Sequence, residues 1–159
     1  MRALFMGEFE HTLDDKGRVI VPAKLRDQIR PLEDGEGFIA THAPENCLYL
    51  YTPREWEGIC QRLAKLPKGT PGLRQFQRRF YSRAEQLTLD RQGRILIPER
   101  LRNKVGIDRD LVLAGCQDRI EVWSKAAWTG QVDDDVSYEE QYQTFLGAEE
   151  EPVAPTLEE

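Results

Sequence analysis

Residues 13–29 read LDDKGRVIVPAKLRDQI, and residues 89–105 read LDRQGRILIPERLRNKV. The two stretches align without a gap at an offset of 76 residues. The identical pairs are Leu13/Leu89, Asp14/Asp90, Gly17/Gly93, Arg18/Arg94, Pro22/Pro98, Leu25/Leu101 and Arg26/Arg102. Self-similarity of this kind indicates an internal repeat. The chain is therefore predicted to contain two copies of one small structural module.

The repeat extends beyond these stretches. LYLYTPREW (48–56) resembles IEVWSKAAW (120–128) at an offset of 72 residues, so the second copy has the shorter internal loop. We expect a first repeat over 7–54, a helical connector over 55–82 and a second repeat over 83–126. A C-terminal helical segment over 127–147 and an acidic, disordered tail over 148–159 are expected to follow.

Each copy has a readable local structure. Asp-x-x-Gly-Arg is typical of a turn, because Asp can accept from nearby backbone amides and Gly can adopt positive φ. The apolar runs 19–21 and 95–97 predict strands buried on both faces. Pro22 and Pro98 favour the first turn of a short helix. Paired strands are expected at 38–41 with 47–51 and at 111–114 with 120–123, which gives strand, turn, strand, helix, strand, strand.

The connector is predicted to be a helical pair. Thr52 and Glu55 have the spacing of a capping box, with Pro53 at the first helical position. Trp56 begins an apolar face at helical spacing, and a second amphipathic helix follows a Pro/Gly-rich break at 67–72. The predicted fold class is mainly β with short helices, that is, α+β.

Length and composition are those of a soluble globular protein. The chain has 159 residues, of which 40% are hydrophobic and 31% charged. It contains no apolar run of the roughly 20 residues that cross a bilayer. The N-terminus turns polar too early for a signal peptide. We therefore expect a cytoplasmic protein that does not act at a membrane.

Charge is distributed unevenly along the chain. The net charge is −6, but residues 126–159 hold ten Asp or Glu and no Lys or Arg, which leaves 22 basic and 18 acidic residues in 1–125. Seven basic residues and no acidic one lie between Glu57 and Glu85. A basic body is compatible with nucleic-acid binding. The basic segment 62–83 is either a solvated helix face or a second DNA surface.

Nothing in the sequence indicates an active site or a metal centre. Cys47, Cys60 and Cys116 are widely spaced, and neither His11 nor His42 lies at metal-ligand spacing from them. No nucleophile motif or phosphate-cradling glycine loop accompanies the carboxylates. We predict no catalytic residues, no metal, no cofactor and no small-molecule substrate.

The duplicated Asp-x-x-x-Arg, each followed by an apolar strand and a Pro-opened helix, resembles the MraZ family. This resemblance covers roughly residues 5–146. It implies two tandem AbrB-like copies that form a swapped-hairpin, or double-split, β-barrel. It also implies a ring-shaped homo-oligomer that is located at the nucleoid. Such a protein binds G-rich direct repeats in the promoter of the division and cell-wall gene cluster, which includes its own gene, and usually acts as a repressor. The family's DNA-binding arginines correspond to Arg18 and Arg94.

Arginine suits this role because its planar guanidinium can donate to guanine O6 and N7 together in the major groove. Further basic residues near the motifs are expected to contact phosphate without reading sequence. They are Lys16, Arg26, Arg91 and Arg102. The remaining motif residues are expected to support the turns. They are Asp14, Gly17, Asp90 and Gly93.

Other interpretations remain open from the residues alone. Asp-x-x-x-Arg could be only an internal ion pair that stabilises the turn. The duplicated module could be a scaffold that assembles without DNA. An AbrB-type antitoxin is a third interpretation, in which the acidic tail would neutralise a basic toxin, although antitoxins usually carry one short copy.

Overall fold

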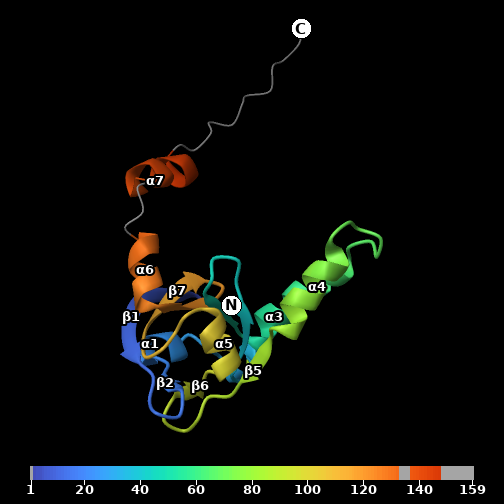
Figure 1. Ribbon diagram of the computed structural model, residues 1–159. Coiled ribbons are helices and arrows are strands. Elements are labelled where there is room, and N and C mark those ends of the chain that lie inside the picture. The colour runs from blue at the N-terminus through green and yellow to red at the C-terminus, as the bar shows by residue number, and fades with distance from the viewer. Residues whose placement is uncertain (1, 133–136, 148–159) are drawn as a thin grey trace. The chain divides into compact units, whose positions relative to one another are not determined.

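The computed structural model describes residues 2–132 and 137–147, so the tail expected at 148–159 lies outside the described residues. Met1–Trp128 form one compact unit, and Thr129–Glu159 form a second. The first unit contains β1 (Phe5–Thr12), β2 (Arg18–Ile20), α1 (Ala23–Arg26), α2 (Pro31–Asp34), β3 (Phe38–His42), β4 (Leu48–Tyr51), α3 (Pro53–Ala64), α4 (Leu73–Ser82), β5 (Glu85–Leu87), β6 (Arg94–Leu96), α5 (Glu99–Lys104), β7 (Asp110–Gln117) and β8 (Ile120–Ser124) (Figure 1). Helix α6 (Lys125–Val132) begins in the first unit, and α7 (Tyr138–Leu146) belongs to the second.

The predicted repeat is visible in the strand pairing. At the repeat offsets, β1 to β4 correspond to β5 to β8. One antiparallel sheet has the order β1-β7-β8-β4-β3-β5, and a second consists of β2 and β6. If each strand is replaced by its counterpart in the other repeat, the strand order of the six-stranded sheet reads the same in reverse. Each copy's first strand therefore pairs with the third strand of the other copy, and the two copies fold as one unit.

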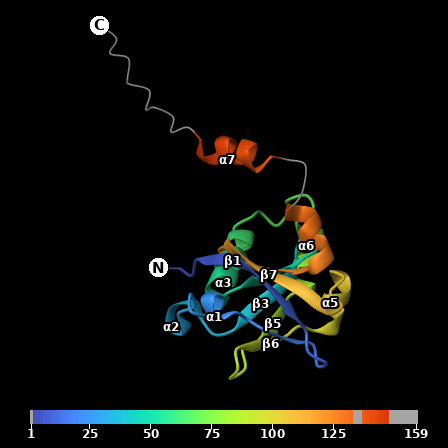
Figure 2. The ribbon, with the colours of Figure 1, turned by 90° about the vertical axis from the view of Figure 1, so that its left-hand side faces the viewer.

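The expected closed barrel is not formed by these ladders. Among the described residues, β1 and β5 are the two edges of the six-stranded sheet, and β2 and β6 pair only with each other. The two sheets and helices α1 and α5 instead enclose one apolar core. Its fully buried side chains include Phe5, Leu25, Ile95, Leu101 and Leu111. The fold is α+β with antiparallel sheets, and its β2–β6 ribbon lies at the bottom of Figures 1 and 2.

The expectation that 19–21 and 95–97 are buried on both faces is wrong. Val19 and Ile95 face the core at 1% and 0% exposure, whereas Leu96 on the next position is 51% exposed. A two-stranded ribbon can rest on a core with one face only, and successive side chains of a strand point to opposite faces. The other face of the β2–β6 ribbon is therefore directed away from the core.

The short helices follow the predicted pattern with a shift of one residue. Pro22 and Pro98 are the N-caps of α1 and α5 and precede the first helical residue. Leu25 and Leu101 point into the core and are fully buried. These helices therefore anchor the chain directly after each strand of the ribbon.

Helices α3 and α4 pack side by side as a hairpin, here called the α3–α4 arm (Figure 1). The predicted cap is present, because Thr52 Oγ1 accepts a hydrogen bond from Glu55 N at 3.3 Å. Trp56 of α3 stacks on Phe80 of α4 with ring centroids 4.9 Å apart. Aromatic packing between the two helices therefore holds the arm together. No described helix is long and apolar enough to cross a membrane.

Candidate nucleic-acid interface

The first Asp-x-x-x-Arg motif forms a closed turn between β1 and β2. Asp14 Oδ1 accepts hydrogen bonds from the backbone N–H groups of Lys16 and Arg18, each at 2.9 Å. Asp14 Oδ2 accepts from Arg18 Nε at 2.7 Å. One carboxylate thus fixes both the backbone of the turn and the base of the arginine side chain.

The second motif repeats this geometry between β5 and β6. Asp90 Oδ1 accepts from the backbone N–H groups of Gln92 and Arg94, each at 2.9 Å, and Asp90 Oδ2 accepts from Arg94 Nε at 2.9 Å. The agreement between the copies supports a role for both aspartates in the turn. It also places each arginine in the same orientation relative to its own strand.

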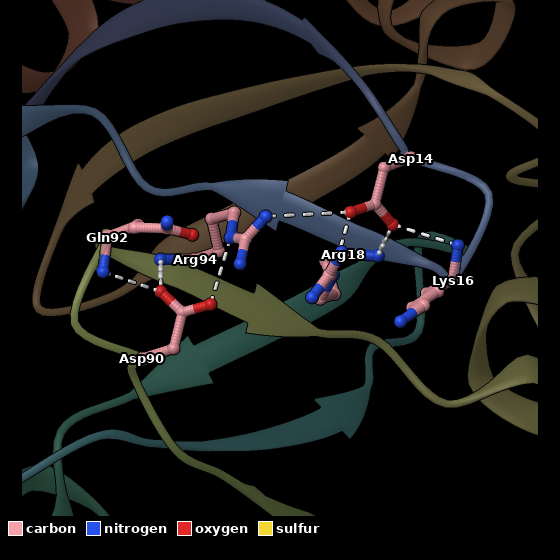
Figure 3. Close-up of polar contacts among 6 residues, drawn as sticks. All are labelled: Asp14, Lys16, Arg18, Asp90, Gln92 and Arg94. Carbon is pink, nitrogen blue, oxygen red and sulfur yellow. Dashed lines mark hydrogen bonds and ion pairs between the residues drawn. The ribbon is translucent and has the colours of Figure 1, made fainter.

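The two arginines lie on the same face of the β2–β6 ribbon. In its antiparallel register Arg18 is opposite Leu96 and Ile20 is opposite Arg94. Figure 3 shows both guanidinium groups between Asp14 and Asp90, and Arg94 Nη1 lies 3.9 Å from Asp14 Oδ2. The arginine side chains are 30% and 29% exposed. They are on the outer face of the ribbon, and neither is enclosed in the core.

The terminal nitrogens of Arg18 remain available to a ligand. Its Nε is taken by Asp14, but Nη1 and Nη2 donate no hydrogen bond to any other residue of 2–132 and 137–147. A guanidinium held in this way keeps a planar pair of terminal donors that no other described residue uses. The arrangement can therefore bind two neighbouring acceptors, such as two oxygens of a phosphate or O6 and N7 of guanine.

Both aspartates are ionised at neutral pH. Backbone hydrogen bonds from Arg18 and Arg94 lower the pKa of Asp14 and Asp90, respectively, below the usual range, and the side-chain bonds to the same arginines act in the same direction. Their negative charges reduce the net positive charge of the ribbon. The positive charge of this face therefore comes from the terminal nitrogens of the two arginines together with basic residues around the turns.

Lys16 and Arg91 occupy exposed positions within the turns, and their contact with phosphate stays a prediction. Arg26 and Arg102 are placed differently. Arg26 Nε donates to Val21 O at 2.7 Å, and Arg102 Nε donates to Ile97 O at 3.0 Å. Both are half-buried, so their phosphate contact stays a prediction while their structural role is visible.

That structural role is to connect the two repeats, an arrangement here called the cross-brace: each arginine packs on the turn of the other repeat. The sequence did not reveal this contact. A Cβ added to Gly93 would lie 2.6 Å from Arg26 Cζ, and one added to Gly17 would lie 3.1 Å from an Arg102 terminal nitrogen. Each arginine therefore packs on the turn of the other copy. Backbone hydrogen bonds from Val21 N to Gly93 O and from Ile97 N to Gly17 O cross in the same way.

Gly93→Ala is expected to destabilise the protein. Gly93 has φ of +77° and Arg26 fills the space beside it, and a non-glycine residue in this region costs on the order of 1–3 kcal/mol. Gly58→Ala is the control, because Gly58 lies inside α3 with nothing within 4 Å of the added Cβ. It should stabilise by about 0.5–1 kcal/mol. Urea unfolding at fixed protein concentration measures the free energy of unfolding of both variants. Equal changes in this free energy would contradict the packing of Arg26 on the Gly93 turn.

Sequence comparisons give the family. The MraZ family, described as "MraZ protein, putative antitoxin-like", matches the chain twice, over residues 4–79 and 80–147. The chain belongs to the MraZ family. A protein named transcriptional regulator MraZ from Syntrophomonas wolfei subsp. wolfei is 44% identical over 126 residues, which cover 79% of this chain and 85% of the relative.

More distant MraZ relatives cover more of the chain. The transcriptional regulator MraZ of Caldanaerobacter subterraneus subsp. tengcongensis is 42% identical over 138 residues, 86% of this chain and 93% of the relative. That of Halothermothrix orenii is 38% identical over 148 residues, 93% of this chain and 98% of the relative. The resemblance drawn from the repeated motif is confirmed, and so is its implication that the protein is a regulator and not an enzyme.

Within the described ranges, no three His, Cys, Asp or Glu side chains converge in a way that could hold a metal ion. Cys47 and Cys116 are instead thiols whose pKa burial raises, for Cys116 to about 11. A thiol with a raised pKa is a poor metal ligand and a poor nucleophile at neutral pH.

Proposed function

We propose that this protein regulates transcription by binding double-stranded DNA with the outer face of the β2–β6 ribbon. The single observation that carries the proposal is the placement of Arg18 and Arg94 on that face, each fixed by its own aspartate. A two-stranded ribbon is narrow enough to enter the major groove. Within this proposal the repeats over 7–54 and 83–126 supply the DNA-binding part of the chain.

In the proposed complex, Arg18 and Arg94 read guanine through their terminal nitrogens. Asp14 and Asp90 orient each guanidinium by accepting from its Nε, at 2.7 and 2.9 Å. Orientation before binding reduces the side-chain entropy that is lost when the complex forms. The aspartates are thus positioning residues, and Gly17 and Gly93 allow the tight turns on which they act.

Phosphate contacts are proposed to come from Lys16 and Arg91, which are exposed in the turns at either side of the ribbon. Such contacts contribute affinity and register without reading bases. Arg26 and Arg102 are proposed to add to them through nitrogens that their structural hydrogen bonds leave unused. The basic balance of residues 1–125, 22 against 18, favours the approach of DNA to this part of the chain.

The target and the assembly are proposed from the MraZ resemblance. The protein is proposed to act in the cytoplasm, at the nucleoid, as a repressor of the division and cell-wall gene cluster and of its own promoter. A ring-shaped homo-oligomer would place several ribbons on G-rich direct repeats at once. Linking weak sites in this way raises the effective concentration of each further contact, so overall affinity can rise by about 10²–10⁴.

A DNA titration tests the proposal. We expect a labelled fragment containing the protein's own promoter to bind more tightly than a shuffled fragment of equal length. Because Lys and Arg release counterions from phosphate, the logarithm of the binding constant should fall linearly with the logarithm of salt concentration. Equal binding of both fragments would overturn sequence-specific recognition, and absence of binding at low salt would favour the scaffold interpretation.

A further inference from the structure

The α3–α4 arm carries an apolar surface that the rest of the first unit leaves uncovered. Leu66, Phe76 and Tyr81 are 43%, 46% and 38% exposed. Leu73 is the buried apolar residue of α4, and α3 has none that is fully buried. Trp56 and Phe80 stack between the two helices, and Phe76 stacks on Phe80 while it remains exposed to solvent.

Beyond the first turns of α3, which contain Glu55 and Glu57, the same arm is basic. Between Glu57 and Glu85 the chain contains no Asp or Glu. Several exposed bases of this segment form no ion pair with any described residue, namely Arg62, Lys65, Lys68, Arg74, Arg78 and Arg79. An apolar patch rimmed by charge of one sign is typical of a protein–protein contact. The chemistry of the arm calls for a partner that is apolar in the middle and acidic at the edge.

Helix α7 has that chemistry. Tyr138, Tyr142, Phe145 and Leu146 are 77%, 49%, 80% and 71% exposed. Their spacing of four, three and one residues places them on one face of a helix. Glu139 and Glu140 lie in its first turn, and residues 126–159 contain no Lys or Arg. A helix with an uncovered apolar face and acidic flanks does not stay isolated in water without a binding partner.

We propose that α7 of one copy of the whole chain packs across the α3–α4 arm of a second copy of the chain. The aromatic face of α7 then lies on the arm, and its glutamates lie beside the arm's arginines. This rests on the homo-oligomer in the proposed function and names its contact. The lengths match: α7 has nine residues and α4 has ten, or about 14 and 15 Å at 1.5 Å per residue. Both surfaces belong to the same polypeptide, so each copy supplies the partner that another copy needs.

The geometry of this contact leads to a ring or a filament. The two surfaces are different parts of the chain, so the interface is heterologous, and a copy that donates α7 still has its own arm to offer. Such head-to-tail contacts close into a ring when the rotation between copies divides a full turn. The contact therefore supplies a physical basis for a ring, and none of the residues that form it belongs to the β2–β6 ribbon.

Light scattering on a sizing column tests the contact with the full chain. Wild type is expected at a multiple of 18.4 kDa, and Phe145→Asp should lower the mass to that of one copy at the same concentration. Leu32→Asp is the matched control, because Leu32 in α2 is fully exposed and should keep the wild-type mass. If Phe145→Asp keeps the wild-type mass, the proposed contact is wrong, whereas the DNA proposal would be unaffected.

Cross-linking identifies the surface that α7 contacts. A photoreactive benzoylphenylalanine at Tyr142, in a mixture of ¹⁵N-labelled and unlabelled full-length copies, is expected to cross-link to residues 56–81 of the other copy. Peptide pairs with one labelled and one unlabelled member would show that the contact is between copies. Cross-links only within a copy, or only to residues outside 56–81, would overturn the proposal.

Discussion

The Arg18→Ala/Arg94→Ala double variant is expected to lose specific operator binding by at least ~25-fold, with its fold and assembly intact. Each well-placed bidentate guanidinium contributes about 1–3 kcal/mol of base discrimination. Two of them contribute about twice that, and ~1.4 kcal/mol corresponds to a tenfold change. Fluorescence anisotropy with the promoter fragment and with shuffled DNA measures the loss. The fold should persist because exposed ion pairs contribute little to stability, typically about 0–1 kcal/mol.

Two further variants separate specific contact from general charge. Arg54→Ala/Lys104→Ala also removes two positive charges, but from exposed residues of α3 and α5. It should weaken both DNA fragments slightly and equally. Arg18→Lys/Arg94→Lys keeps the charge but lacks the planar fork, so it should keep binding to shuffled DNA and lose preference for the operator. Operator affinity in the alanine variant equal to that of the Arg54/Lys104 control would rule out the assigned contacts.

Ile95→Ala is expected to lower the free energy of unfolding by about 3 kcal/mol. The side chain of Ile95 is fully buried on the core face of the ribbon. Removing a large apolar side chain from a packed core costs roughly 2–5 kcal/mol. The side chain also packs with Val19 on the core face of the ribbon, so the cost includes a poorer platform for the arginines. Urea unfolding at fixed protein concentration gives the difference.

The neighbouring residue provides the control for this prediction. Leu96 follows Ile95 on the same strand but is 51% exposed on the outer face. Leu96→Ala should change the stability by less than about 1 kcal/mol, as exposed substitutions usually do. Similar losses for Ile95→Ala and Leu96→Ala would mean that both faces of the ribbon are buried, and the outward placement of the arginines would then be wrong.

Much of the local structure follows from short-range chemistry and could be predicted. Asp14 and Asp90 form the turns that their spacing indicates, and Thr52 caps α3 as its capping box predicts. The repeat itself indicated that each copy carries the same elements. These features depend on a few neighbouring residues, so the sequence contains the information that determines them.

Features that depend on pairing between distant strands could not be predicted in the same way. The apolar run Ile95–Ile97 is compatible with burial on one face or on two, and its pairing with β2 leaves Leu96 exposed. The barrel was expected from family resemblance, but the described ladders form one six-stranded sheet and one ribbon. The choice depends on which strands of the two copies meet.

The candidate site was found only in part. The positions of Arg18 and Arg94 came from the motif, yet their shared face depends on the β2–β6 register, which no local pattern contains. In the sequence, Arg26 and Arg102 are recognisable only as positive charges near the motif. Their packing on the turn of the other repeat could not be predicted from it. The identical Arg26/Arg102 pair in the repeat was the one signal that could have indicated a common structural role.

A double-mutant cycle between protein and DNA tests the central claim most directly. Replacing guanines of the operator with 7-deazaguanine removes the N7 acceptor and keeps Watson–Crick pairing. If Arg18 and Arg94 donate to guanine, at least one replacement should weaken wild-type binding by roughly 1 kcal/mol, a part of the about 1–3 kcal/mol of a full bidentate pair, and have no effect on the Arg18→Ala/Arg94→Ala variant. The same loss in both proteins would show that the arginines do not contact those bases.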